Sequence, residues 1–468
     1  MAYLKTKGRN ALAVGFAVFM TGLVALTSAG PARAQEGQGI VLLRDAETEA
    51  WLRKLTTPVF VAAGIDPQAV HIYIVGDQSI NAFVSGGQNL FVNTGLIVAA
   101  DTPNELVGVF AHETGHMAGG HLTRDPGGSV TIPYIIGMVA GIGAMAAGSP
   151  NAGSAILAGS ETIAQANAIA FTRVQEASAD QAAARFLRAS GQSGKGLLTL
   201  FEKLANDEAM SYYQIPPFLE DHPAPPERIA ALQDEMEKSP YYNKEDPQSE
   251  IDKLNLIKAK IYGFLDRTDA GLRRYPTSDK SAPARYARSV LYFRQADMTD
   301  ALSEINSLIA EQPKNAYFEE LKGQELYEIG RAQEAVEPYE KAVTLEGNQP
   351  LLRVGWGQAL SAAAEKTNDQ AMLEKGAIEL RAALAVDPDM PDAWQSLGQV
   401  YSLQGKEGLA ELATAEMYYN AGNLGPAVEF AVRARRKLDQ GSVPYNRATD
   451  ILEVVKASGA DLRERKLD

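Results

Sequence analysis

The C-terminal part of the chain repeats a pattern of apolar and small residues at a fixed interval. A set of four residues recurs 34 positions further on: Ala301, Ile305, Leu308 and Pro313 are followed by Ala335, Tyr339, Ala342 and Gly347. A period of 34 residues is typical of a helix–turn–helix unit, which buries its apolar face by stacking on neighbouring units. This period constrains the fold more than any other feature, and it predicts an α-solenoid over residues 284–468.

Glycines mark the same position in the first helix of successive units. Gly323 and Gly357 are 34 residues apart, and Gly398 lies within Trp394–Tyr401, which matches the tetratricopeptide pattern W-x-x-L-G-x-x-Y. The step of 41 residues from Gly357 to Gly398 implies an insertion of seven residues near 365–370. After Gly405 the pattern weakens, but 418–422 and 427–438 still predict a helix pair.

The polar and proline-containing stretch 271–283 predicts a linker between this domain and an N-terminal domain over 35–270.

The first 34 residues have the composition of a cleavable signal peptide. Basic residues precede an apolar run over 11–26, and the small residues Ala32 and Ala34 precede Gln35. An uncleaved membrane anchor is the alternative, although the apolar run is short for a spanning helix. The chain has no cysteine and a formal net charge of −14, which argues against structural disulfides, thiol chemistry and nucleic-acid binding. The sequence therefore predicts export to the periplasm.

The motif His112-Glu-Thr-Gly-His116 predicts a metal centre. Residues four apart lie on one face of a helix, so both imidazoles can face a single ion. The preceding residues 106–111 are apolar and compatible with a helix, which is the context this motif needs. Glu113 is then close enough to act as a general base toward the attacking water.

The surrounding pattern predicts a mainly α fold with a small β-sheet. Residues 46–63 have helical apolar spacing, whereas 71–75 and 89–93 have the composition of short strands separated by a turn at 85–88. A helix is expected to begin at Pro103, with Asp101 or Thr102 as its cap, and to carry the histidine motif. Further helices are expected over 161–190 and 195–210.

The third protein ligand of the metal has two candidates. His121 follows His112 by nine residues, one fewer than in the motif HExxHxxGxxH, so its ring would be misdirected. Glu176 lies on a later predicted helix, and Asp180 is one turn beyond it on the same face. Asp180 is therefore expected to form a hydrogen bond to a ligand histidine.

The segment 132–158 is uncharged over most of its length and rich in glycine and alanine. A polar interruption at 149–154 makes it too short to span a membrane. It predicts a helical hairpin packed on the catalytic domain as a lid, and peripheral membrane contact is the alternative.

Together these motifs resemble the gluzincin metallopeptidases that include HtpX and the CAAX prenyl proteases. The resemblance rests on His112–His116, on Glu-x-x-x-Asp at 176–180, on Asn81-Ala-Phe83 upstream, and on His222-Pro with Arg228 downstream. A signal peptide before this domain and tetratricopeptide repeats after it are similar to the periplasmic branch of the family.

The resemblance implies a role for each matched residue. His112, His116 and Glu176 would bind one zinc ion per chain, with Glu113 as the general base. His222 would be a fourth ligand that closes the site or a hydrogen-bond donor in the transition state. Arg228 would orient that loop or polarise the substrate carbonyl, and His121 would support a ligand.

The function implied is that of a periplasmic zinc metalloendopeptidase in outer-membrane protein assembly and quality control. Misfolded or assembling outer-membrane proteins and the assembly machinery would bind through the repeats. The substrate peptide is expected to lie extended beside an edge strand at 89–93. The alternative is a chaperone or scaffold for outer-membrane protein assembly in which the protease site is latent.

Overall fold

A computed structural model describes residues 41–121, 173–210, 217–223 and 225–457. The expected signal peptide (1–34) and the expected lid (132–158) lie outside these residues. The chain divides into two compact units, with the division between Glu304 and Ile305. No described helix is both long enough and apolar enough to cross a membrane.

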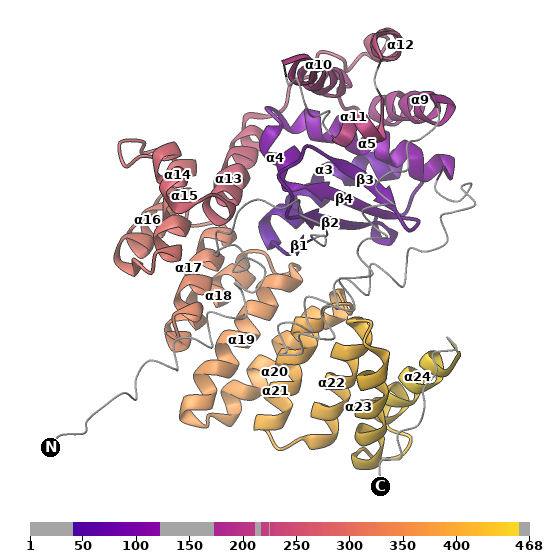
Figure 1. Ribbon diagram of the computed structural model, residues 1–468. Coiled ribbons are helices and arrows are strands. Elements are labelled where there is room, and N and C mark those ends of the chain that lie inside the picture. The colour runs from indigo at the N-terminus through magenta and orange to yellow at the C-terminus, as the bar shows by residue number, and fades with distance from the viewer. Residues whose placement is uncertain (1–40, 122–172, 211–216, 224, 458–468) are drawn as a thin grey trace, which may run out of the picture. The chain divides into compact units, whose positions relative to one another are not determined.

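The first unit combines a small sheet with several helices (Figure 1). Its N-terminal elements are β1 (Leu42–Leu43), α3 (Ala46–Ala62), the 3-10 helix η2 (Pro67–Ala69), β2 (His71–Val75), β3 (Ala82–Ser85), β4 (Asn89–Asn93), α4 (Thr94–Ala99) and α5 (Pro103–Gly119). Its later helices are α9 (Arg173–Ala189), α10 (Lys195–Met210), α11 (Pro217–Asp221), α12 (Pro226–Glu237), α13 (Gln248–Leu265), α14 (Thr268–Arg274) and α15 (Ala282–Arg294). The strands expected at 71–75 and 89–93 and the helix expected at 195–210 have these bounds.

The order of the strands corrects the expected place of the substrate. The four-stranded sheet has the order β1-β2-β4-β3, with β4 parallel to β2 and antiparallel to β3. Both edges of β4 are therefore occupied, and the prediction that a peptide pairs beside 89–93 was wrong. The edge strands of the sheet are β1 and β3, and β3 is the one that contacts α5. No strand was expected at β3, whose last residue, Ser85, lies inside the expected turn. The turn itself is made by Gly86 and Gly87, which have φ values of 58° and 94°.

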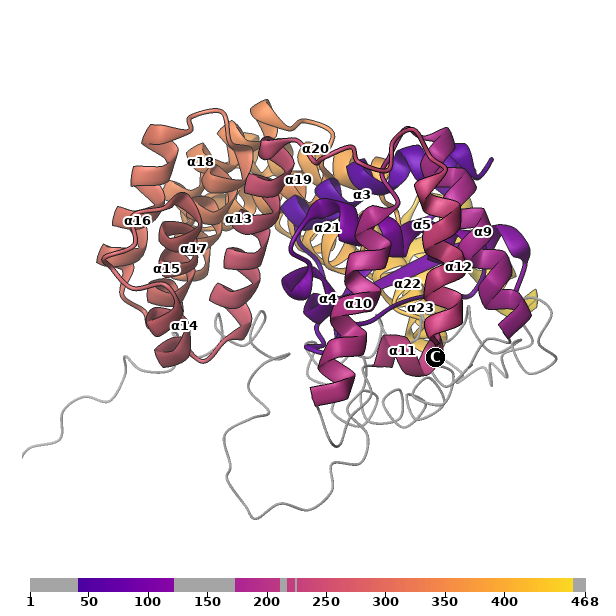
Figure 2. The same ribbon diagram turned by 90° about the horizontal axis from the view of Figure 1, so that it is seen from above.

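Helix α5 lies at the centre of this unit, in contact with α3, α9, α10 and β3. Figure 1 shows α9, α10 and α12 on one side of the sheet, and Figure 2 shows these helices grouped around α5. It begins at Pro103 as expected, with Thr102 as N-cap, although the Thr102 side chain makes no capping hydrogen bond. Instead Glu105 Oε2 accepts a hydrogen bond from the backbone N–H of Asp101 at 2.9 Å. Helix α5 ends at Gly119, and its C-cap residue Gly120 has a φ of 60°, which is left-handed and favours glycine.

Buried charges join α3 to α13 and α15. Glu47 is fully buried, and it accepts hydrogen bonds from Tyr286 Oη at 2.8 Å and from Lys253 Nζ at 3.0 Å. Lys260 is also buried, and it forms an ion pair with Asp45, the N-cap residue of α3.

The segment 271–283, which was expected as a linker, lies inside this unit, and so does α15 after it. A helix expected to open the repeats is therefore anchored to α3, the first described helix of the first unit.

Paired helices make up the described part of the second unit (Figure 1). They are α17 (Ala316–Glu328), α18 (Ala332–Leu345), α19 (Pro350–Thr367), α20 (Gln370–Val386), α21 (Pro391–Leu403), α22 (Glu407–Asn420), α23 (Leu424–Lys437) and α24 (Val443–Ala457), while α16 (Met298–Glu311) spans the division between the units. Helices α19 and α20 have 18 and 17 residues, compared with 13 and 14 in α17 and α18. The insertion expected near 365–370 therefore lengthens both helices of one pair.

The repeated glycines differ in how tightly they are packed. A Cβ atom on Gly323 would lie 2.8 Å from the Tyr339 ring, and one on Gly357 would lie 2.7 Å from Leu380. At Gly398 the nearest atoms would be 3.5 Å away, an ordinary contact. The close helix contact expected at all three glycines is therefore present at the first two and relaxed at the third.

The pair between Asp45 and Lys260 predicts an acid-sensitive contribution to stability. Burial raises the pKa of Asp45, but the Lys260 ammonium and the hydrogen bonds from Lys260 and Thr48 together lower it by more, so the pKa lies below its ordinary value of 3.8. An aspartate with a depressed pKa stabilises the fold above its unfolded-state pKa, and this stabilisation is lost as the pH falls.

Asp45→Asn keeps the N-cap hydrogen bond but removes the charge. We expect the variant to lower the free energy of unfolding by about 1–3 kcal/mol at pH 7. The difference from wild type should shrink as the pH falls through 3.8. Urea unfolding of chelator-treated protein at pH 7 and pH 3 measures this, and an equal difference at both pH values would contradict the assignment.

Candidate metal centre

Helix α5 presents His112, Glu113 and His116 to the interior of the first unit. All three side chains are fully buried, and the Nε2 atoms of the two histidines lie 3.1 Å apart. The apolar residues 106–111 precede them on the same helix and belong to the core. The four-residue spacing and the buried helix therefore bring both rings to one point, as the sequence predicts.

A close backbone contact between α5 and α9 brings Glu176 to the same point. A Cβ atom on Gly115 would lie 2.7 Å from the carbonyl oxygen of Ala179, so only glycine allows this approach. Glu176 Oε1 lies 3.3 Å from His116 Nε2, and Oε2 lies 3.4 Å from His112 Nε2.

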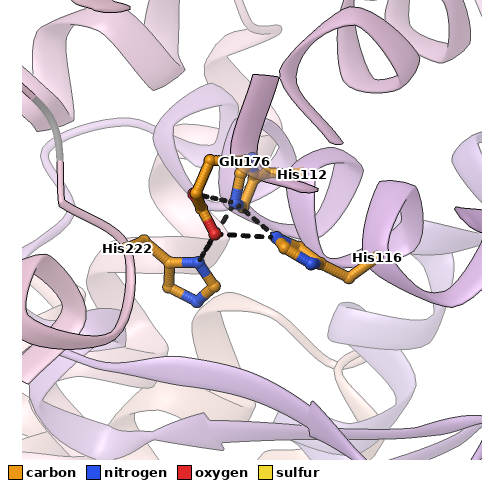
Figure 3. Close-up of side chains that lie close together, drawn as sticks. All are labelled: His112, His116, Glu176 and His222. Carbon is orange, nitrogen blue, oxygen red and sulfur yellow. Dashed lines mark hydrogen bonds and ion pairs between the residues drawn. The ribbon is translucent and has the colours of Figure 1, made fainter. Parts of the chain in front are cut away.

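His222, which directly follows α11, completes the group from a third direction (Figure 3). Its Nδ1 atom lies 3.0 Å from Glu176 Oε1 and 3.3 Å from His112 Nε2. The four donor atoms lie within 4.8 Å of one another, and all four residues are buried. The structure thus brings together three predicted ligands and the residue predicted beside them.

The spacing of these donors fits a small tetrahedral metal ion. Nitrogen and oxygen ligands of zinc lie about 2.0–2.1 Å from the ion, so the edges of such a tetrahedron are about 3.3–3.4 Å long. Five of the six donor pairs are separated by 3.0–3.4 Å, from His222 and Glu176 at 3.0 Å to His112 and Glu176 at 3.4 Å, and the sixth pair, His116 and His222, lies within the 4.8 Å that bounds the group. Three imidazoles and one carboxylate are also a donor set that divalent transition metals accept.

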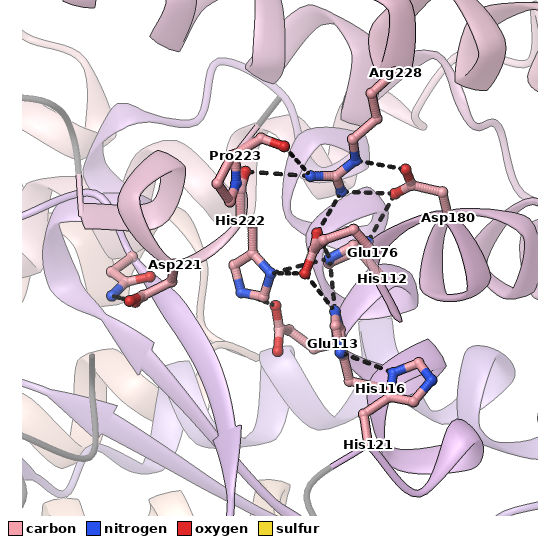
Figure 4. A network of polar contacts seen from close by, with 11 residues as sticks. His112, Glu113, His116, His121, Glu176, Asp180, Asp221, His222, Pro223 and Arg228 are labelled. Carbon is pink, nitrogen blue, oxygen red and sulfur yellow. Dashed lines mark hydrogen bonds and ion pairs between the residues drawn. The ribbon is translucent and has the colours of Figure 1, made fainter. Parts of the chain in front are cut away.

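The outer nitrogen of each α5 histidine has its own partner (Figure 4). His112 Nδ1 lies 2.9 Å from Asp180 Oδ1, and His116 Nδ1 lies 3.1 Å from His121 Nδ1. Such partners fix the orientation of a ring and direct its other nitrogen inward. His121 reaches His116 because the left-handed Gly120 turns the chain back after α5, so His121 lies outside the four-donor group.

Arg228 holds the other side of the centre. Its Nε and Nη2 atoms donate to the two oxygens of Asp180 at 2.7 and 2.9 Å, and Nη2 also lies 2.8 Å from Glu176 Oε2. Its Nη1 atom donates to the carbonyl oxygens of His222 and Pro223 at 3.2 and 2.8 Å. The guanidinium is thus directed at the residues of the site. This geometry favours the loop-orienting role over polarisation of a substrate carbonyl.

Burial and neighbouring charges shift the pKa values of the buried glutamate and histidines of the site in different directions. Burial raises the pKa of Glu113 to about 8 and lowers that of His116 to about 3. Burial also acts to lower the pKa of His112, but its hydrogen bonds to Asp180 and Glu176 outweigh this and raise the value to about 9. The centre therefore favours a cation beside its carboxylates, and a metal ion would displace a proton from His112.

Asp221 was not identified from the sequence. It is buried, and its Oδ2 atom accepts a hydrogen bond from Asn81 Nδ2 at 3.0 Å. The two residues are 140 positions apart, so no local pattern links them. The only signal was the resemblance of Asn81-Ala-Phe83 and of His222-Pro to family motifs, which gave no role to Asp221.

Asp180 provides a test of the outer contacts. Asp180→Asn removes the carboxylate that both His112 and Arg228 contact, while it keeps the size of the side chain. We expect the affinity for a divalent metal to fall about 10–100-fold, as measured by competition with a chromogenic chelator. Gln181→Ala, an exposed neighbour on α9, is the matched control and should bind like wild type. Equal affinity in wild type and Asp180→Asn would exclude this supporting role.

The comparisons with known proteins agree with this geometry. Residues 46–236 match the model of Peptidase family M48. The "Beta-barrel assembly-enhancing protease" of Yersinia pestis is 25% identical over 393 residues, covering 81% of this chain and 77% of that protein. "Metalloprotease LoiP" of Escherichia coli strain K12 is 29% identical over 209 residues, 43% of this chain and 77% of that protein. The crystal structure of yeast Tom70 covers 78% of this chain at 9% identity, with a TM-score of 0.28. Residues 46–236, which contain the whole donor group, therefore form a domain similar to Peptidase family M48.

Proposed function

We propose that the protein is a zinc-dependent endopeptidase whose metal ligands are His112, His116 and Glu176. The observation that carries the proposal is the buried group of donors, with Glu113 beside it: Glu113 Oε1 lies 3.3 Å from His222 Nε2. Zinc prefers nitrogen and oxygen ligands in tetrahedral sites, and three protein ligands leave one position for catalysis. His222 is proposed as the fourth donor, which occupies the position that a catalytic water would otherwise take.

Each residue of the site has a separate role in the proposed hydrolysis of a peptide bond. A bound zinc ion would polarise the scissile carbonyl and lower the pKa of the attacking water. Glu113 accepts the proton of that water and passes it to the leaving amine, and a raised pKa suits both transfers. Asp180 and His121 hold the ligand rings, and Arg228 holds the loop that carries His222. His222 has to leave its place for water and substrate to enter.

The substrate is proposed to bind as an added strand along β3. This strand pairs with β4 on one side and contacts α5 on its face. The backbone amide of Val84 in β3 faces the Glu113 carboxylate. A peptide paired with this edge would therefore run past the catalytic base, held by backbone hydrogen bonds that tolerate many sequences.

The proposed setting is the periplasm, with outer-membrane proteins as clients. The basic and apolar N-terminus and the absence of cysteine support export. The relative from Yersinia pestis is named for enhancing β-barrel assembly, and 81% of this chain aligns with it. The paired helices of the second unit form a repeat array of the kind that binds proteins. A chaperone or scaffold with a latent protease site is the second candidate, and the closing position of His222 favours it.

Glu113→Gln tests the catalytic proposal. The amide keeps the shape of the side chain but cannot accept the proton, so casein hydrolysis should fall by about 10²–10⁴-fold while metal content is unchanged. Glu105→Gln alters the other buried glutamate of α5 and serves as the matched control. Undiminished turnover in Glu113→Gln would sink the mechanism. If Glu113→Gln still supports β-barrel assembly in a folding assay, this result would favour the proposal that the protein is a chaperone or scaffold.

Removal of the repeats tests the client-binding proposal. The chain should be cut after Lys314 rather than before α15, because Tyr286 is hydrogen-bonded to Glu47 and the first unit extends to Glu304. We expect residues 35–314 to retain peptide hydrolysis and to lose binding of an unfolded outer-membrane protein in a pull-down assay. Retained capture of the client would refute recruitment by the repeats.

A further inference from the structure

The segment that carries His222 is held from two sides. On one side Arg228 donates to the carbonyl oxygens of His222 and Pro223, as described above. On the other side Asn81 Nδ2 donates to Asp221 Oδ2 at 3.0 Å, and the backbone N–H of Phe218 donates to Ile80 O at 3.3 Å. Helix α11 is therefore attached directly to the start of the edge strand β3.

The attachment point on the sheet is rigid. The backbone oxygen of Asn81 accepts from the N–H of Asn93 at 3.0 Å, and Asn93 Nδ2 donates to Ser79 Oγ at 2.9 Å. A Cβ atom on Gly95 would lie 2.1 Å from the carbonyl oxygen of Gln78, so the loop before Asn81 is pressed against α4. Asn81 therefore cannot follow α11 if α11 moves, and the bond to Asp221 opposes such a movement.

The bond between Asn81 and Asp221 is buried and involves a carboxylate. The exposed fractions are 4% for Asn81 and 9% for Asp221, while His222 is fully buried. Hydrogen bonds to a charged acceptor are stronger than neutral ones, and loss of one partner leaves the other buried without it. Consecutive Cα atoms are about 3.8 Å apart, so a displacement of Asp221 displaces His222.

We infer that Asn81 and Asp221 are a positioning pair that keeps His222 in the donor group, and that this pair links the substrate-binding edge strand to the closing of the metal site. The inference rests on the proposed function, because it requires His222 to be a donor to the bound metal. The pair is connected to the donor group through His222, which directly follows Asp221 in the chain.

Cobalt(II) substitution provides the readout, since the visible spectrum of cobalt reports the number and type of its ligands. The proteins compared are wild type, His222→Ala, Asn81→Ala, Asp221→Ala and the exchange variant Asn81→Asp with Asp221→Asn. Asn104→Ala is the matched control, because the Asn104 side chain also joins two distant segments, donating to Ser193 O at 2.8 Å, but these segments do not carry His222. Circular dichroism and the melting temperature of the chelator-treated proteins establish that each variant folds.

We expect Asn81→Ala and Asp221→Ala to shift the cobalt spectrum toward that of His222→Ala. Their metal dissociation constants should rise about 10–100-fold, the usual effect of losing a residue that supports a ligand. The exchange variant restores the hydrogen bond with donor and acceptor reversed, so it should regain the wild-type spectrum. Asn104→Ala should retain that spectrum throughout.

Two results would overturn the inference, and they are distinguishable. If His222→Ala changes the spectrum but Asn81→Ala and Asp221→Ala do not, the pair has no positioning role although the ligand set is correct. If His222→Ala leaves the spectrum of cobalt-loaded protein unchanged, His222 is not a donor, and the proposed closing of the site fails together with the inference.

Discussion

The contact between Gly115 and Ala179 is the constraint on which the metal centre depends. Helix α5 supplies two histidines, but a histidine pair alone leaves a metal ion with too few protein ligands. The missing Cβ atom of Gly115 lets the backbone of α9 approach, and Glu176 and Asp180 then lie on either side of this contact along α9. One carboxylate reaches the donor group and the other reaches the outer nitrogen of His112. A side chain at position 115 would move both carboxylates at once.

The balance of charge explains why the centre is built around a cation. Four carboxylates are buried here, on Glu113, Glu176, Asp180 and Asp221. Among the described residues of the site, Arg228 is the one side chain with a permanent positive charge, and it is committed to Asp180 and Glu176. Burial of uncompensated carboxylates is costly. Burial is the main cause of the raised pKa of Glu113, and the carboxylates of Glu176 and Asp221 add to it. The carboxylates of Asp180 and Glu176 raise the pKa of His112.

Much of the fold followed from local sequence, but the contacts around His222 did not. The bounds of β2, β4 and α10 and the start of α5 were predicted, because apolar periodicity and caps are local signals. The strand β3 was missed because its last residue lies in the expected turn. Without β3, the sheet order could not be inferred, and β4 was wrongly taken as the edge. Glu176 was chosen over His121 with the help of a family resemblance, whereas the bond from Asn81 to Asp221 joins residues too distant for any spacing argument.

The amide of Val84 gives the edge strand a second effect on the chemistry. This N–H group faces Glu113 and favours the charged form of its carboxylate, which holds the pKa lower than burial alone would. An incoming peptide that pairs with β3 competes for the same N–H group through its own carbonyl oxygen. A peptide on this edge would therefore change the surroundings of the catalytic base directly, besides lying next to it.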